Sequence, residues 1–273
     1  MRIRGDDNDQ GPLASIRNAA KDIERTTRNL SSGNRLNSAA DDAAALSIAE
    51  NLATRVRSLQ AVQRNVQTGV SLAQTADAGL QNIQEGVQRV RELATRAANG
   101  TLDDADRQAI QAEINQITAE IDRTATDTQF NGRALLNGQA GGANAVQITA
   151  GANAETVAID IADTRAAAIG LDTVDVTTQA GAQAAVQAAD QALQQVSQTR
   201  SQVGANQNAL QRIANRVGTQ AANEAAAESR IRDADIAQES TLRAAALIRS
   251  RFAVAVEAQR NQNRGSILNL LNE

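Results

Sequence analysis

Apolar residues recur at strict spacings of three and four between Leu59 and Ala97. Leu, Val, Ile and Ala fill the repeat with one Gly, at Leu59, Val62, Val66, Gly69, Ala73, Ala76, Leu80, Ile83, Val87, Val90, Ala94 and Ala97. A repeat that continues over nearly six heptads is typical of a coiled-coil helix. Extended back to about Asp42, it predicts a helix of roughly 80 Å at 1.5 Å per residue, which ends at Asn99-Gly100.

Two further helices are predicted after this one. The first follows Thr101-Leu-Asp-Asp104, which resembles a capping box, and it has an isoleucine stripe at Ile110, Ile114, Ile117 and Ile121. The second runs from about Gln183 to Arg230, with apolar positions at Val186, Ala189, Leu193, Val196, Val203, Leu210, Ala214, Val217 and Ala221. Arg200 and Gln207 interrupt this second seam. Such polar positions either set the register of the coiled coil or face a groove between subunits.

The segment between the second and third predicted helices has a different composition, rich in Gly, Ala, Thr and Val. Apolar and polar residues alternate in Val146-Gln-Ile-Thr149 and again in Thr156-Val-Ala-Ile-Asp-Ile161. Alternation of this kind predicts a small β-hairpin within residues 139–181. We expect this hairpin at the tip of the molecule, where the chain reverses direction.

Both ends of the chain carry short amphipathic segments. Leu13, Ile16, Ala20, Ile23, Thr27 and Leu30 keep the spacing of three and four, and so do Ile267, Leu270 and Leu271. Short isolated helices are marginal in water, so we expect the two ends to pair and to be covered by partners. The candidate self-assembly residues are Leu13, Ile16, Ile23, Leu30, Ile267, Leu270 and Leu271. The predicted fold is mainly α: an elongated antiparallel coiled-coil rod with a small β-hairpin and paired terminal helices.

Composition supports narrow helix packing and excludes several function classes. Aromatic residues make up 1% of the chain, as Phe130 and Phe252, so small aliphatic side chains must form the core. The formal net charge of -4 gives no basic field for nucleic acid. The chain has no Cys, His or Tyr, which removes the commonest nucleophiles, general bases and transition-metal ligands. It also has no Gly-x-Ser-x-Gly, phosphate loop or dinucleotide fingerprint, so we expect neither an enzyme nor a cofactor.

The sequence also argues against a membrane protein and against a calcium site near the start. No apolar run approaches the ~18 residues of a membrane span, and the seams are narrow and rich in Ala, unlike lipid-binding helices. Residues 1–10 are charged and lack the apolar stretch of a cleaved secretory signal. Asp6-Asp-Asn-Asp-Gln-Gly11 begins like a calcium loop, but Arg17 stands at the twelfth position, where a bidentate Glu is required.

Several blocks of sequence, in a fixed order, resemble the bacterial flagellin family. These are Leu30-Ser-Ser-Gly-Asn-Arg-Leu-Asn-Ser-Ala-Ala-Asp-Asp-Ala-Ala45, Gln88-Arg-Val-Arg-Glu-Leu-Ala94, Ala98-Asn-Gly-Thr101, Ile110-Gln-Ala-Glu-Ile114, Glu120-Ile-Asp-Arg123, Gln129-Phe-Asn-Gly132, Ser229-Arg-Ile-Arg-Asp-Ala-Asp235 and Ala258-Gln-Arg-Asn261. Ile267-Leu-Asn-Leu-Leu271 follows them. The resemblance covers about residues 13–138 and 183–273.

The resemblance implies a structural subunit that polymerises into the flagellar filament used for swimming. Residues 1–42 and 233–273 would form an inner tube, and residues 43–232 an outer helical rod with its β-hairpin. The large variable outer domains of the family are missing. The family is exported unfolded through the flagellar type III channel without a cleaved signal and folds outside the cell. Its implied partners are copies of the chain, an export chaperone, the filament cap and hook-associated proteins.

The resemblance leaves one alternative function open. A hook–filament junction protein also pairs its termini in a tube, and it is the alternative function. The charged start at residues 1–9 and the side chains of Phe252, Glu257, Arg260 and Arg264 depart from the family pattern and would alter the inner tube. Arg89, Leu93 and Glu113 match positions through which an innate immune receptor detects some members, although packing between subunits also explains them.

Overall fold

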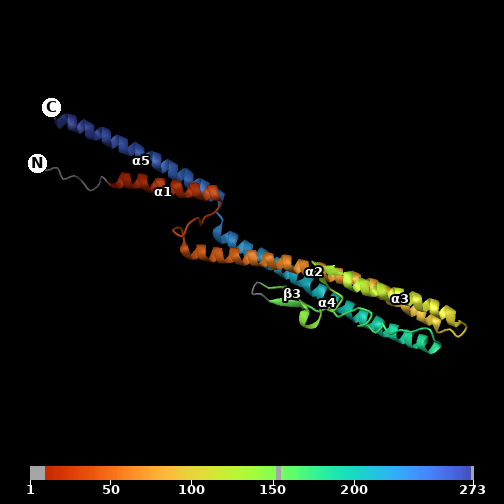
Figure 1. The fold of residues 1–273 in the computed structure, drawn as a ribbon. Coiled ribbons are helices and arrows are strands. Elements are labelled where there is room, and N and C mark those ends of the chain that lie inside the picture. Colours follow the sequence, from red (N-terminus) through yellow and green to blue (C-terminus); the bar gives the residue numbers. More distant parts are fainter. Residues whose placement is uncertain (1–9, 152–154, 272–273) are drawn as a thin grey trace. The chain divides into compact units, whose positions relative to one another are not determined.

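The computed structural model describes residues 10–151 and 155–271, which are mainly helical (Figure 1). The helices are α1 (Gln10–Ser32), α2 (Ala43–Ala97), α3 (Asp104–Asp127), α4 (Gln179–Arg232) and α5 (Ile236–Leu271), with a short 3-10 turn η2 (Gly142–Asn144). Strands β1 (Gln129–Phe130) and β2 (Arg133–Ala134) form one antiparallel pair, and β3 (Val146–Thr149) and β4 (Thr156–Ile159) form another. The prediction of a mainly α fold with a small β-hairpin is confirmed.

The chain divides into two compact units. The terminal unit comprises residues 1–56 and 223–273, and the central unit comprises residues 57–222. The boundaries predicted from the sequence, at 42/43 and 232/233, coincide instead with the breaks between α1 and α2 and between α4 and α5. The assignment of these parts to an inner tube and an outer rod stays a prediction.

The coiled coil of α2 and α4 forms the core of the central unit. Every predicted seam position from Leu59 to Ala97 is buried, which confirms the heptad pattern. On α4 the buried positions are mostly alanines and valines: Ala182, Ala185, Ala189, Ala192, Val196, Thr199, Val203, Leu210, Val217 and Ala221. Val186, Leu193 and Ala214 lie at the edge of this seam, where they are partly buried. The small side chains let the two helices pack closely, as expected for a narrow coiled-coil seam.

Gly69, the weak position in the α2 repeat, has a packing role. A Cβ atom at this position would lie 3.1 Å from Cγ1 of Ile148 and 3.2 Å from Cδ1 of Leu210. Glycine therefore lets β3 lie directly against α2 beside α4. The β-hairpin thus packs along the two long helices.

The hairpin does not lie at the turn between α2 and α4, so its predicted position at the tip is wrong. The amide of Gln179, at the start of α4, donates to the carbonyl of Ala98 at the end of α2 (3.2 Å). The two helix ends therefore meet at Ala98 and Gln179, whereas the hairpin contacts α2 at Gly69. The reason is α3, which carries the chain back along α2 before the strands begin (Figure 1).

Two side chains at the start of α3 fix its position. Asp103 is its N-cap and accepts from the backbone N–H of Asp106, so the capping box predicted from Thr101 is displaced by two residues. Arg107 is buried and donates to the carbonyls of Ala97 and Asn99 at 3.1 and 3.0 Å. The guanidinium therefore satisfies carbonyls that the end of α2 leaves free.

Arg200, one of the two interruptions of the α4 seam, bonds across the coiled coil to α2. Its Nε donates to Oδ1 of Asp77 at 3.0 Å, and its Nη1 donates to Oε1 of Gln84 at 2.7 Å. These contacts are satisfied in one alignment of the two helices. They favour the register-setting interpretation of Arg200 over a groove between subunits.

Candidate assembly surface

α1 and α5 pair antiparallel in the terminal unit through small and polar side chains. Ala19, Thr26 and Asn29 of α1 are buried, and so is Ala246 of α5. Asn29 donates from Nδ2 to Oε1 of Glu239 at 2.9 Å, and Arg249 lies 3.8 Å from Asp22. Such a seam removes little apolar surface from water, so it contributes little free energy compared with the core of the central unit.

A buried carboxylate oxygen weakens this seam further. Oε2 of Glu239 is buried and accepts no hydrogen bond from the part of the chain that the structure describes, whereas the buried Oε2 of Glu257 lies 3.6 Å from Nη1 of Arg260. A buried acceptor without a donor costs about 1–3 kcal/mol. The pairing of α1 with α5 therefore has marginal stability as long as no other contact supports it.

The candidate self-assembly residues are only partly covered by the pairing of α1 with α5. Ile16, Ile23 and Leu30 are half-buried, and Leu13 is 49% exposed. The buried stripe is displaced by one residue from the predicted one, because Ala19 and Thr26 are buried where Ala20 and Thr27 were expected. Ile267 is 57% exposed, and the side chains of Leu270 and Leu271 lie outside the described residues.

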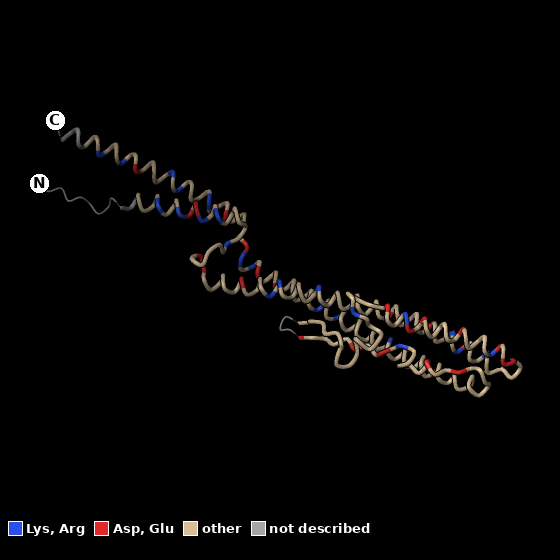
Figure 2. The backbone as a smooth tube through the Cα atoms, viewed as in Figure 1, with Lys and Arg blue, Asp and Glu red and all other residues tan. Residues whose placement is uncertain are grey.

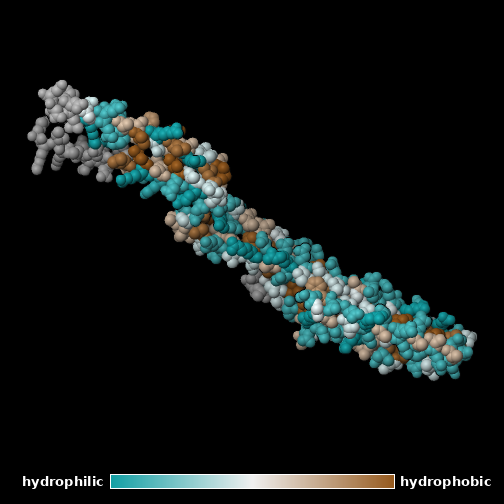
Figure 3. Space-filling view, turned by 45° about the horizontal axis from the view of Figure 1, so that its top comes forward, coloured by the Kyte–Doolittle hydropathy of each residue, from teal (hydrophilic) through white to brown (hydrophobic). Residues whose placement is uncertain are grey.

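Most of the exposed large apolar side chains are on α5, and apart from Phe252 and Ile267 the sequence interpretation did not name them. All the large apolar side chains found exposed in the described parts of the chain belong to the terminal unit, and most of them to α5: Ile236, Leu242, Leu247, Ile248, Phe252, Val254, Val256 and Ile267. Figure 3 shows apolar atoms gathered over the paired helices α1 and α5. An exposed apolar patch of this kind marks an interaction site.

The composition of residues 242–256 explains this exposure. Only Arg243, Arg249, Ser250 and Arg251 are polar among these fifteen residues, so apolar side chains surround the helix. A helix that is apolar on all sides is normally buried on all sides. α1 covers one side of it only. A search for apolar helical segments without amphipathic periodicity would have identified this stretch from the sequence.

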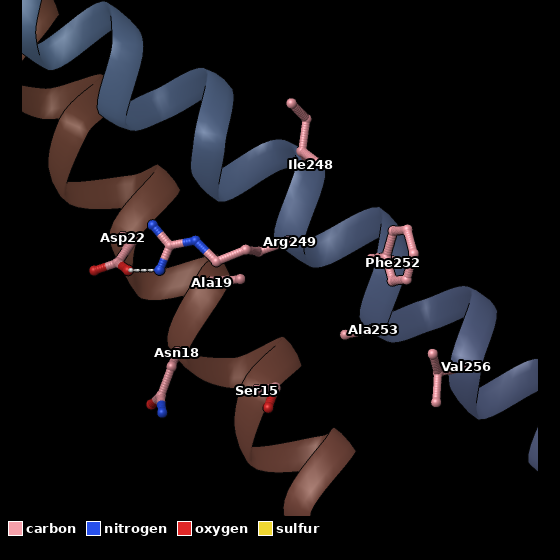
Figure 4. Close-up of a pocket in the computed structure, with 9 residues that line it drawn as sticks. All are labelled: Ser15, Asn18, Ala19, Asp22, Ile248, Arg249, Phe252, Ala253 and Val256. Carbon is pink, nitrogen blue, oxygen red and sulfur yellow. Dashed lines mark ion pairs between the residues drawn. The ribbon is translucent and has the colours of Figure 1, made fainter.

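A groove of about 740 Å³ runs between α1 and α5 at this surface (Figure 4). Ile248, Phe252 and Val256 line it from α5, and Ser15, Asn18 and Ala19 line it from α1. Phe252 is 72% exposed and projects from α5, whereas Ala253 points toward α1. Asp22 and Arg249, which lie 3.8 Å apart, add two charged groups to the otherwise mainly apolar lining. Among the four residues that depart from the family pattern, Phe252 therefore lies in the groove.

Glu257 and Arg260, two further departures, lie on the side of α5 that faces α1. Both are partly buried, and their charged groups are 3.6 Å apart. Arg264 is exposed. The charged start at residues 1–9 lies outside the described residues.

The connection between α1 and α2 is held by backbone and carboxylate hydrogen bonds within the terminal unit. Gly33 ends α1 with a φ of +72°, and its carbonyl accepts from the backbone N–H of Ala234 at 2.9 Å. Arg35 donates from its backbone N–H to the carbonyl of Arg232 at 2.7 Å and from Nη2 to the carbonyl of Ile231 at 2.8 Å. These bonds tie the end of α4 and the link between α4 and α5 to the residues that follow α1.

The candidate receptor residues lie in the central unit, where two are exposed and one is buried. The guanidinium of Arg89 donates to Glu113 at 2.8 Å and to Glu92 at 3.3 Å. The hydrogen bond to Glu113 is the main reason that the pKa of Arg89 is raised. Leu93 is 2% exposed, so this side chain packs in the core. A second protein can therefore reach Arg89 and Glu113 directly but not Leu93.

The described residues give no geometry for a metal site or a membrane span. No cluster of three acidic side chains that could hold a metal ion occurs in residues 10–151 and 155–271. Within the same ranges, no helix contains an apolar stretch that is long enough to cross a bilayer.

Comparison with known families covers most of the chain. Residues 10–141 match the bacterial flagellin N-terminal helical region, and residues 186–271 match the bacterial flagellin C-terminal helical region. The chain belongs to the bacterial flagellin family. The β3–β4 hairpin lies between the two matched flagellin regions.

Individual relatives agree with the family match. Phase 1 flagellin of Salmonella naestved is 39% identical over 163 residues, which are 59% of this chain and 32% of the relative. The aligned part thus spans about a third of the length of this curated flagellin. The crystal structure of Bacillus cereus flagellin is similar at 34% identity with a TM-score of 0.51, covering 60% of this chain and 94% of that chain.

A second solved structure shares the fold alone. A putative flagellar hook-associated protein from Vibrio parahaemolyticus has a TM-score of 0.58 at 17% identity, covering 70% of this chain and 99% of that chain. At this identity the likeness does not distinguish a filament subunit from a junction protein.

Proposed function

We propose that this chain is a structural subunit of an extracellular bacterial flagellar filament and that it polymerises with copies of itself through the terminal unit. One observation carries the proposal: residues 242–256 of α5 carry apolar side chains around the helix, yet α1 covers only one side of it. Burial of apolar area is the dominant favourable term in most protein association. Membership of the flagellin family supports copies of the same chain as the partner.

Packing of this kind requires no catalytic residue. The subunit transmits torque passively, and the filament is held together by side chains of the terminal unit that one chain leaves exposed. The candidate residues Leu13, Ile16, Ile23, Leu30 and Ile267 lie next to this surface or within it. We expect them to be covered in the filament together with the apolar side chains of α5.

Seeded polymerisation tests the proposal. Purified full-length monomer, added to short filament seeds and imaged by electron microscopy, should form tubes of uniform width. A chain that lacks residues 1–30 should stay monomeric, because it has lost almost all of α1, while circular dichroism still shows a helical central unit. Full-length monomers that never add to seeds, under any salt or protein concentration, would contradict the proposal.

The copy number in isolated filaments separates a filament subunit from a hook–filament junction protein. The family match supports the filament subunit, for which we expect this chain to be a major component of sheared filaments. A junction protein would be present in a few copies per filament. Quantitative mass spectrometry of sheared filaments measures this ratio.

The other partners and the route of export are proposals of the same kind. As a flagellin, the chain would use an export chaperone, a filament cap and hook-associated proteins, and it would leave the cell without a cleaved signal. Detection by a host innate immune receptor would use the exposed pair of Arg89 and Glu113, with Leu93 supporting it from the core. Replacing Arg89 by Asp should reduce the response of receptor-expressing reporter cells to free subunits, with Arg91→Asp as the control.

A further inference from the structure

The turn between α2 and α3 contains Asn99 followed by Gly100, a dipeptide that is open to chemical rearrangement. Both residues are exposed to water. The backbone nitrogen of a glycine can attack the side-chain amide carbon of a preceding asparagine, because glycine has no side chain that hinders a close approach. The attack is fast only where the asparagine side chain lies over the next peptide and where donors stabilise the charges that develop.

The side chain of Asn99 already lies over the peptide that follows it. Its Oδ1 accepts a hydrogen bond from the backbone N–H of Thr101 at 3.1 Å, which makes an Asx turn. This turn brings Cγ of Asn99 towards the Gly100 nitrogen. The Thr101 N–H also points at the oxygen that becomes negative when Cγ is attacked, and a donor placed in this way stabilises the tetrahedral intermediate.

A buried arginine acts on the attacking nitrogen through the peptide bond. Nη2 of Arg107 donates to the backbone carbonyl of Asn99 at 3.0 Å, and the backbone N–H of Leu102 donates to the same oxygen at 3.4 Å. The Gly100 nitrogen attacks after it has lost its proton, and resonance spreads the resulting negative charge onto this carbonyl oxygen. A charge-assisted hydrogen bond from the guanidinium stabilises that anion. Arg107 is only 7% exposed, so water screens the interaction weakly.

We propose that Asn99 deamidates without an enzyme and that Arg107 promotes the reaction. The Gly100 nitrogen forms a bond to Cγ of Asn99, the bond from Cγ to Nδ2 breaks, and the proton given up by the Gly100 nitrogen leaves with Nδ2 as ammonia. A cyclic imide remains. Water then adds a hydroxyl group to one imide carbonyl and a proton to the nitrogen, which opens the ring.

The position of Arg107 also selects the product. The imide carbonyl that was the backbone carbonyl of Asn99 is polarised by the guanidinium, so water opens the ring there. The main chain then continues through Cγ as isoaspartate, and the new carboxylate stays beside Arg107. The turn from α2 to α3 gains one main-chain atom and one negative charge. This inference does not depend on self-assembly.

Two other Asn-Gly pairs of the chain serve as internal references. Asn137 also makes an Asx turn, with the backbone N–H of Gln139 at 3.1 Å, and Asn131 is exposed in the β1–β2 turn. Their backbone carbonyls accept no hydrogen bond from the part of the chain that the structure describes. Neither pair therefore has the contact that Arg107 makes with Asn99, and we expect Asn99 to react first.

Peptide mapping by mass spectrometry tests the proposal. The folded full-length chain is incubated in mildly alkaline buffer, and the conversion of Asn99, Asn131 and Asn137 is followed over time. Asn99 should react about tenfold faster than Asn137 and give mainly isoaspartate, as expected for one added hydrogen bond to a charged group. In the chain unfolded by guanidinium chloride, the three rates should become similar. Equal rates for Asn99 and Asn137 in the folded chain would overturn the inference.

Variants separate promotion by Arg107 from a role that only holds the turn. Arg107→Gln keeps a donor but removes the charge, so the Asn99 rate should fall about tenfold, and Arg107→Lys should restore part of it. A rate that rises in Arg107→Gln would show that the guanidinium protects the turn, which contradicts the inference. Circular dichroism checks that each variant is folded.

Gly100→Ala is the matched control for the attacking nitrogen. Its Cβ would lie 3.6 Å from Nε2 of Gln179, an ordinary contact, so the variant should fold. The added methyl group hinders the attack, so Asn99 should react more slowly while Asn137 keeps its rate. An unchanged Asn99 rate would exclude the imide route. None of these outcomes bears on filament formation, so the proposed function is tested separately.

Discussion

Asp41 organises the turn that connects α1 with α2. Its Oδ2 accepts hydrogen bonds from the backbone N–H of Asn37 at 3.1 Å, from the backbone N–H of Ser38 at 2.9 Å and from the Ser38 hydroxyl at 3.0 Å. The bond from the Ser38 backbone is the main cause that lowers the pKa of Asp41. The ionised carboxylate, and not the acid, therefore holds this turn.

The lowered pKa predicts how the turn responds to acid. A carboxylate whose pKa is lower in the folded chain than in the unfolded chain contributes stability above about pH 4, and this contribution is lost as the pH falls through the folded value. At pH 7, Asp41→Asn should weaken the turn by about 1 kcal/mol. Hydrogen exchange of the Asn37 and Ser38 amides should be faster in the variant, and the two proteins should converge at about pH 2–3. An equal difference at both pH values would contradict this account.

Two glycines in the central unit predict opposite responses to the same substitution. A Cβ at Gly79 would lie 2.6 Å from Oγ1 of Thr128 and 2.7 Å from Cδ1 of Leu136, whereas Gly204 has nothing within 4 Å. Gly79→Val should lower the free energy of unfolding by about 2 kcal/mol, because the end of α3 and the loop after β2 must move. Gly204→Val should be neutral or slightly stabilising, because Val favours the helix more than Gly does. Urea denaturation of both variants gives the comparison.

At the scale of helices, the strength of the periodic pattern decided what the sequence could predict. The α2 seam repeats without interruption, so its direction and extent followed from spacing alone. In α1 the buried stripe could include either Ala19 and Thr26 or Ala20 and Thr27. The sequence could not decide between them, because the two pairs consist of the same residue types. In α5 the residues from Leu242 to Val256 have no polar side that would indicate which side faces solvent. The sequence therefore did not predict their exposed surface.

The same limit applies to contacts between segments distant in sequence. The strands β3 and β4 were predicted from their alternation, but their position beside Gly69 depends on the return path of α3. The capping of α2 by Arg107 also depends on that path. Local patterns specify elements well, and they carry little information about which elements meet.

The contact of Arg200 with α2 predicts a measurable coupling. The side chains of Arg200 and Asp77 are about one-third exposed, at 31% and 41%, so solvent weakens their attraction. A double-mutant cycle with Arg200→Gln and Asp77→Asn should therefore give a coupling energy of about 0.5 kcal/mol in thermal or urea unfolding. Arg64→Gln, at an exposed position of α2, replaces Arg200→Gln in the control cycle. A coupling no larger than that of the control would contradict a register role.

For the whole molecule, the distribution of charge predicts how salt affects assembly. α1 and α5 together carry nine Lys or Arg and four Asp or Glu, although the chain as a whole is acidic (Figure 2). Packing terminal units against each other brings like charges together, and salt screens this repulsion. The lowest protein concentration that supports seeded growth should therefore fall as NaCl rises from about 20 to 200 mM, which a sedimentation assay measures. A rise over this range would indicate that ion pairs between copies dominate.

The uneven division of apolar side chains between the two units has a thermodynamic consequence for the free subunit. The central unit encloses its own apolar residues, whereas α5 has too few neighbours within one chain. Mass action stabilises only those parts of a protein that bind a partner. Calorimetry should resolve two melting steps, of which the cooler one moves upward with protein concentration while the hotter one stays fixed. Dilution alone would then release the two ends of the chain while its middle remains folded.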